Sequence, residues 1–157
     1  FSISLGFKFR EYNDYEDNAR YTLYHNKGVY GVSNLKIEYL IFFQKGIVDA
    51  ENSFEDSIVF KYHRERAGDP EIYTEIFEMS SDDLLPDNFT RPRIITLAIR
   101  DIGTVNFNHF VKNSDGSFEE ESFARPASTL TYVYPENVQE EGYFLNEKIY
   151  LGAEKES

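Results

Sequence analysis

Alternation of apolar and polar residues is the main pattern along this chain. Among the first ten residues every second side chain is apolar: Phe1, Ile3, Leu5, Phe7 and Phe9. A period of two is typical of a strand with one buried face. Similar segments recur at residues 21–25, 35–43, 58–62, 94–99, 105–111, 117–123, 130–134 and 143–151. We therefore expect an all-β, mainly antiparallel protein, a β-sandwich or barrel-like fold with one or two short helices.

Two of these segments are apolar on both faces and predict strands at the centre of the fold. Residues 94–99 are of this kind, and Ile95, Leu97 and Ile99 are expected to face the core. In residues 35–43 one face changes from Lys36 and Glu38 to apolar side chains. The second half of that strand is therefore expected to run beneath a covering element.

Turn residues divide the strands into hairpins. Asn113-Ser114-Asp115-Gly116 predicts a tight turn, because Asp-Gly readily adopts positive φ angles. The return strand carries three consecutive glutamates at 119–121, and charge of this kind protects a sheet edge from pairing with another chain.

Three further segments complete the predicted organisation. Residues 71–79 have mixed helical and strand spacing, and the preceding turn favours a hairpin. Pro135 to Gly142 has the residue order of a short helix. We expect one domain over residues 1–152 and a frayed tail over residues 153–157.

The composition narrows the classes of partner. The 157 residues include no cysteine, which excludes thiol redox chemistry and disulfides. The formal net charge of −12 disfavours nucleic acid and anionic membranes, and favours a basic protein or a cation. No apolar run is long enough to span a bilayer, so membrane insertion is not expected. The sequence leaves the compartment open, and an extracellular or cell-surface location is slightly favoured over the cytoplasm.

An acidic, tyrosine-rich segment near the start is the candidate binding region. Asp14, Glu16 and Asp17 are candidate calcium ligands, because calcium takes oxygen ligands from flexible loops; a solvated loop is the alternative. The tyrosines of this part of the chain are candidate contacts for a protein or glycan ligand: Tyr12, Tyr15 and Tyr24. A tyrosine ring is apolar and its hydroxyl is polar, which suits binding surfaces and half-buried sheet faces alike.

Recognisable catalytic motifs are missing from the sequence, and no residue is assigned a catalytic role. The histidines are far apart along the chain: His25, His63 and His109. His109 lies in phase with the apolar face of residues 105–111, so we expect a neutral histidine in the core. Asn88-Phe89-Thr90 matches the acceptor motif for N-glycosylation.

These patterns predict a non-catalytic β-sandwich that binds a partner through an acidic, tyrosine-rich surface. The first alternative is an acidic inhibitor or immunity-type protein that covers a basic site on a protein partner. The second is a carbohydrate-active hydrolase. An enzyme is the less favoured class, because no catalytic motif is present.

Overall fold

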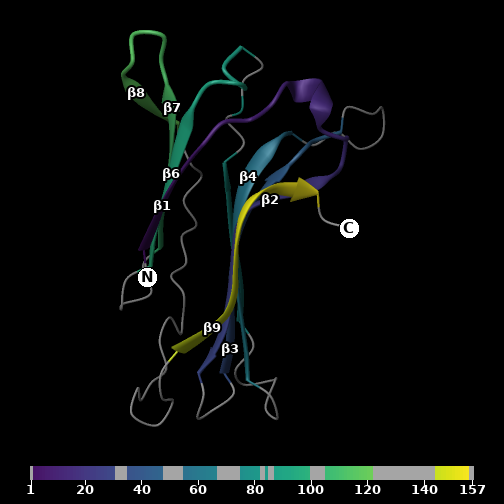
Figure 1. Ribbon diagram of the computed structural model, residues 1–157, viewed down its shortest axis with the longest axis vertical. Helices are drawn as coiled ribbons and strands as arrows, with labels where there is room; N and C mark the ends of the chain where they lie inside the picture. Colours follow the sequence, from purple (N-terminus) through teal and green to yellow (C-terminus); the bar gives the residue numbers. More distant parts are fainter. Residues whose placement is uncertain are drawn as a thin grey trace.

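In the part of the chain that the computed structural model describes, nine antiparallel strands form two sheets that face each other (Figure 1). The structure describes residues 2–30, 35–47, 55–66, 75–81, 84, 87–99, 105–121 and 144–155. The strands are β1 (Ser2–Phe7), β2 (Arg20–Tyr30), β3 (Leu35–Gln44), β4 (Ser57–Arg66), β5 (Glu75–Ser81), β6 (Arg93–Ile99), β7 (Val105–Lys112), β8 (Phe118–Glu121) and β9 (Phe144–Lys155). In these ranges the helical structure is one 3-10 turn, η1 (Tyr12–Asp14). The prediction of an all-β antiparallel fold is confirmed.

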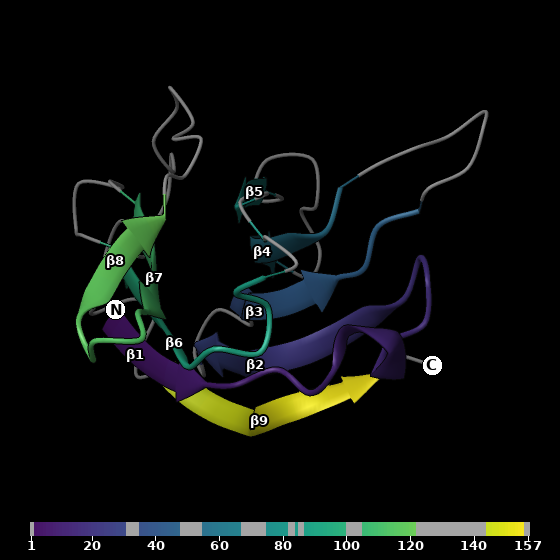
Figure 2. The same ribbon diagram turned by 90° about the horizontal axis from the view of Figure 1, so that it is seen from above.

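The two sheets combine strands that are distant in the sequence. One has the order β1-β6-β7-β8 and the other the order β5-β4-β3-β2-β9. Figure 2 shows that β1 and β9 lie along the same side of the sandwich, and β8 and β5 along the opposite side. The chain changes sheet between β1 and β2, so residues 8–19 cross one end of the sandwich.

The central strand β6 has the burial that its sequence predicts. Ile95, Leu97 and Ile99 are buried, which confirms their inward orientation. In β1 the corresponding residues Ile3, Leu5 and Phe7 are only partly buried, because β1 has one neighbour among the described strands of its sheet. Phe9 is buried beyond the end of β1, and Phe1 lies outside the described residues.

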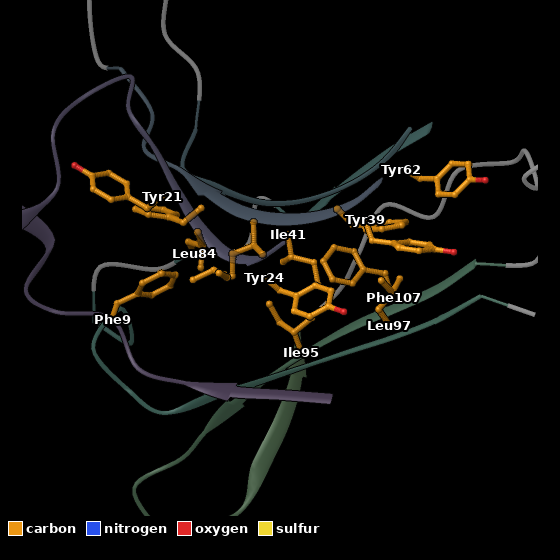
Figure 3. Packing of buried hydrophobic residues seen from close by; sticks show 14 of the residues in the cluster. Phe9, Tyr21, Tyr24, Tyr39, Ile41, Tyr62, Leu84, Ile95, Leu97 and Phe107 are labelled. Carbon is orange, nitrogen blue, oxygen red and sulfur yellow. The ribbon is translucent and has the colours of Figure 1, made fainter. Parts of the chain in front are cut away.

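Aromatic rings fill much of the space between the sheets (Figure 3). At the end crossed by residues 8–19, the rings of Phe9 and Phe89 stack with centroids 4.7 Å apart. The rings of Tyr15 and Tyr21 meet edge to face at 4.8 Å. Aromatic pairs of this geometry stabilise by about 0.5–1.5 kcal/mol beyond the area they bury.

The outer face of the five-stranded sheet has its own apolar cluster. Leu40 and Phe42 of β3 are buried together with Val59 of β4, which lies opposite Phe42 in the register. The guanidinium of Arg20 lies 4.8 Å from the Phe42 ring centroid. The second half of β3 is therefore apolar and buried on both faces, as the change from polar to apolar residues indicated.

The predicted hairpin between β7 and β8 is confirmed. The Asn113 N–H donates to the Ser117 carbonyl at 2.7 Å, and Gly116 has a φ of 91°, a conformation that favours glycine. β8 is the edge of its sheet, as its glutamates predicted.

Residues 75–79 belong to β5, which pairs with β4, so the hairpin interpretation is confirmed there; residues 71–74 lie outside the described residues. β9 continues to Lys155, where Thr22 and Tyr21 of β2 pair with its last residues, and the frayed tail over residues 153–157 stays a prediction. The expected strand at 130–134 and helix at 135–142 also lie outside the described residues.

Candidate functional site

The crossing loop at one end of the sandwich contains most of the residues that the sequence singled out. It runs from residue 8 to residue 19 and includes η1. The turn is closed by backbone bonds from Asp14 N–H to the Glu11 carbonyl and from Tyr15 N–H to the Tyr12 carbonyl. Asn18 adopts a φ of 60°, which asparagine tolerates better than most residues. The loop is therefore an ordered turn rather than an extended tether.

Two tyrosine hydroxyls fix the backbone of this loop from below. The Arg10 N–H donates to the Tyr15 hydroxyl at 3.1 Å, and the Glu16 N–H donates to the Tyr21 hydroxyl at 2.8 Å. Both rings are buried among the aromatic residues of the core. A buried tyrosine usually has a partner for its hydroxyl, and here that partner is the loop itself.

The structure separates the three tyrosines that were predicted to contact a ligand. Tyr15 and Tyr24 are core residues. Their rings are buried, although the sequence pattern predicted them on the surface. The reason is that Tyr15 packs under the crossing loop and Tyr24 faces the opposite sheet. Tyr12 alone of the three is exposed, at 38% of its surface. Ligand binding by Tyr12 remains a prediction.

The buried ammonium group of a lysine side chain lies under the loop. The Lys45 ammonium, just after β3, donates to the Tyr15 carbonyl at 2.5 Å and to the Tyr12 carbonyl at 3.4 Å. It forms an ion pair of 3.1 Å with Asp17 and lies 4.3 Å from the centroid of the Tyr12 ring. Lys45 is almost completely buried, so its charge depends on these oxygens for solvation.

The predicted calcium ligands are only partly brought together. Asp14 and Glu16 are exposed, and Asp17 turns its carboxylate toward Lys45. Among the described residues no group of three or more His, Asp or Glu side chains is placed to share a metal ion. Sequence reasoning missed Lys45, although a single lysine directly after the apolar strand 35–44 was a visible signal.

Tyr12 is also tied to the neighbouring loop through Asp56. Its hydroxyl donates to Asp56 Oδ1 at 3.2 Å, and the same oxygen accepts from the Gly46 N–H at 2.7 Å. Burial raises the pKa of Tyr12 to about 12, helped by the nearby carboxylates of Asp56 and Asp17. The phenol therefore stays protonated near neutral pH and acts as a hydrogen-bond donor rather than as a base.

A buried polar cluster lies deeper at the same end of the sandwich. Arg93 Nη1 donates to His109 Nε2 at 2.9 Å, and Arg93 Nη2 donates to the carbonyl and to Oδ1 of Asn88 at 2.8 and 2.9 Å. The exposed fractions of Arg93 and His109 are 1% and 0%. Burial, and the adjacent Arg93 cation, lower the pKa of His109 to about 3. The prediction of a neutral core histidine is confirmed, and its arginine partner was not foreseen.

The same cluster changes the interpretation of the glycosylation motif. Asn88 is buried and its side-chain oxygen is bonded to Arg93. In the folded protein this amide is therefore not accessible as a glycan acceptor.

The other two histidines lie away from the loop end, on the outer face of the five-stranded sheet. His25 Nε2 is 2.9 Å from Glu38 Oε1, and the register places His63 opposite Glu38. The three histidines therefore share no common site.

The comparisons with known proteins add no assignment. No protein-family model, curated protein or solved structure matches this chain. In the described part of the chain, no helix has the length and apolar character needed to cross a membrane.

Proposed function

We propose that this protein is a non-catalytic binding module that presents the acidic surface of its crossing loop to a basic protein partner. The observation that carries the proposal is an ordered loop with exposed carboxylates. Glu11, Asp14, Glu16 and Asp17 are all exposed, within a seven-residue stretch whose backbone is held from below.

The fixed backbone matters because binding costs conformational entropy. A flexible acidic segment would have to be ordered when it binds, which weakens the complex. Here Lys45, Tyr15 and Tyr21 already bond the loop backbone in one conformation. The carboxylates are therefore presented in a set geometry on a rigid β-scaffold, which is a common arrangement for binding loops.

Charge favours a basic partner. Lys45 forms an ion pair with Asp17, and the chain as a whole carries a net charge of −12. Such a field speeds the encounter with a cationic surface and makes it sensitive to salt. Tyr12 lies at the same end and offers one exposed aromatic side chain, a residue type enriched at binding hot spots.

The acid–base groups at this end are engaged in structural roles. His109 is buried and neutral, and Tyr12 is a protonated donor to Asp56. This arrangement supports binding over catalysis. The inhibitor-type alternative uses the same acidic surface and differs only in that the partner's basic site is an active site.

A defined cationic probe tests the proposal. The ¹⁵N-labelled protein is titrated with a decalysine peptide, and amide chemical shifts locate the binding surface. Shifts should concentrate on residues 11–18. The double variant Asp14→Asn with Glu16→Gln should weaken binding by about fivefold, because two charges of the contact are removed.

The matched control is the double variant Glu119→Gln with Glu120→Gln on β8, which removes the same charge from exposed residues elsewhere. It should bind the peptide almost as wild type does. Equal weakening in both double variants would show that the peptide senses only net charge, and the proposed surface would be rejected.

A further inference from the structure

The outer face of the four-stranded sheet is open along three adjacent strands. In β1, β6 and β7 less exposed residues alternate with more exposed ones, and the more exposed ones point away from the core. Figure 2 shows this face turned away from the five-stranded sheet. It consists of Ser2, Ser4 and Gly6 of β1, Ile94, Thr96 and Ala98 of β6, and Asn106, Asn108 and Phe110 of β7.

Regular strand pairing places these side chains in rows across the sheet. In one row Ser4 lies opposite Thr96, and Thr96 lies opposite Asn108. The Asn108 side-chain amide donates to the Thr96 hydroxyl at 3.4 Å, so the two polar groups lie side by side on the surface. The neighbouring row contains Ser2, Ala98 and Asn106. Successive strands are roughly 4.8 Å apart, so polar groups recur at that spacing across the face.

The two polar rows carry no charged side chain, although charged residues make up 28% of the chain and its net charge is −12. A polyanion such as nucleic acid needs cations on the protein surface, and a basic partner needs acids. Hydroxyl and amide groups instead both donate and accept hydrogen bonds. Their complement is a neutral molecule whose own polar groups also do both, and sugar hydroxyls are of this kind.

Apolar groups continue the same face beyond the polar rows. The third row contains Gly6, Ile94 and Phe110. Phe118 of β8 lies diagonally across from Phe110 in the register and is 45% exposed. A Cβ atom at Gly6 would meet no other atom within 4 Å, so the surface above it is open. Apolar side chains beside a few polar groups are the usual composition of a site for a small organic molecule, and a sugar ring presents both CH groups and hydroxyls.

We propose that this outer face binds a neutral polysaccharide. Small side chains on a sheet form a flat surface, which suits an extended polymer that is contacted at several sugar units better than a single enclosed sugar. A protein partner is less favoured, because serine and alanine, which occur on this face, are depleted at protein interfaces. The site is separate from the acidic crossing loop, so the two proposals stand or fall independently.

Titration of the ¹⁵N-labelled protein with neutral hexasaccharides provides the test. The probes are cellohexaose, laminarihexaose, maltohexaose and mannohexaose, each raised to about 10 mM because flat sites of this kind bind weakly. The expected result is that one or more of them shifts the amides of β1, β6 and β7. The Kd should change less than about twofold between about 0.05 M and 0.5 M salt, because no charge takes part.

Two substitutions that keep the shape of the side chain remove the polar groups. Thr96→Val and Asn108→Leu should each weaken binding about threefold, and the double variant about tenfold, because each removes hydrogen bonds to the sugar. Thr22→Val makes the same change on β2 of the other sheet and should leave the Kd unchanged. The loop variant Asp14→Asn with Glu16→Gln should also bind the hexasaccharide as wild type does.

Circular dichroism and thermal melting confirm that each variant is folded. The inference is overturned if none of the four hexasaccharides shifts an amide, or if the shifts concentrate on residues 11–18 of the crossing loop. Equal weakening by Thr96→Val and Thr22→Val would also reject the outer face as the site. A Kd that rises steeply with salt would show that charged groups carry the contact, which contradicts a neutral site.

Discussion

The buried pair of Arg93 and His109 should make the stability of this protein fall between pH 7 and pH 5. His109 Nε2 accepts from Arg93, so adding a proton there would break the bond and place two cations 2.9 Å apart in the core. The pKa of His109 is accordingly lowered from 6.5 to about 3 in the folded protein. The unfolded chain keeps the ordinary value and binds the proton first.

The sign and size follow from proton linkage. A histidine whose pKa is depressed on folding contributes its full stabilisation above pH 6.5, and the contribution is lost as pH falls from 6.5 toward 3. Each pH unit in this window removes about 1.4 kcal/mol, so lowering the pH from 7 to 5 should cost about 2 kcal/mol. Most carboxylates titrate below this range, which leaves histidine as the main contributor.

Urea unfolding followed by circular dichroism at pH 7 and pH 5 measures the change. In His109→Gln the amide oxygen can still accept from Arg93 but does not titrate, so the loss of stability between the two pH values should shrink by most of the roughly 2 kcal/mol. His63→Gln removes an imidazole from the other sheet and serves as the control. The reasoning is refuted if His109→Gln loses as much stability as wild type when the pH is lowered.

Four further changes test the core, the loop and the hairpin. Leu97→Ala should reduce the free energy of unfolding by about 2–5 kcal/mol, because the side chain is completely buried; a loss below about half a kcal/mol in urea titrations would contradict this. Lys45→Met should cost about 1–3 kcal/mol and speed hydrogen exchange of the amides of residues 14–16, since it leaves the Tyr15 carbonyl without its donor; unchanged exchange would show that Lys45 does not hold the loop. Gly116→Ala should cost about 1 kcal/mol in the same titrations because of its positive φ; a neutral result would mean that the turn relaxes. Millimolar calcium should leave the melting temperature unchanged, because the ammonium of Lys45 already occupies the converging loop oxygens; a rise that is lost when both Asp14 and Asp17 are changed to Asn would instead show a calcium site.

The sequence by itself determined those features that depend on a single strand or a single turn. Period-two alternation placed Ile95, Leu97 and Ile99 in the core, because side chains of a strand point alternately to its two faces. The turn ending in Gly116 was readable because its backbone angle requires a particular residue type. His109 was placed in the core for the same reason as its apolar neighbours, since it lies in phase with them.

Only the tertiary structure decided which residues meet across elements. Tyr15 was predicted on a surface, but its burial depends on how residues 8–19 cross from one sheet to the other. Lys45 reaches loop oxygens that precede it by some thirty residues, and Arg93 finds its histidine on the neighbouring strand. Alternation reports which face of a strand is apolar, but not which strand lies beside or opposite it. The partners of buried charges therefore become visible only once the two sheets are assembled.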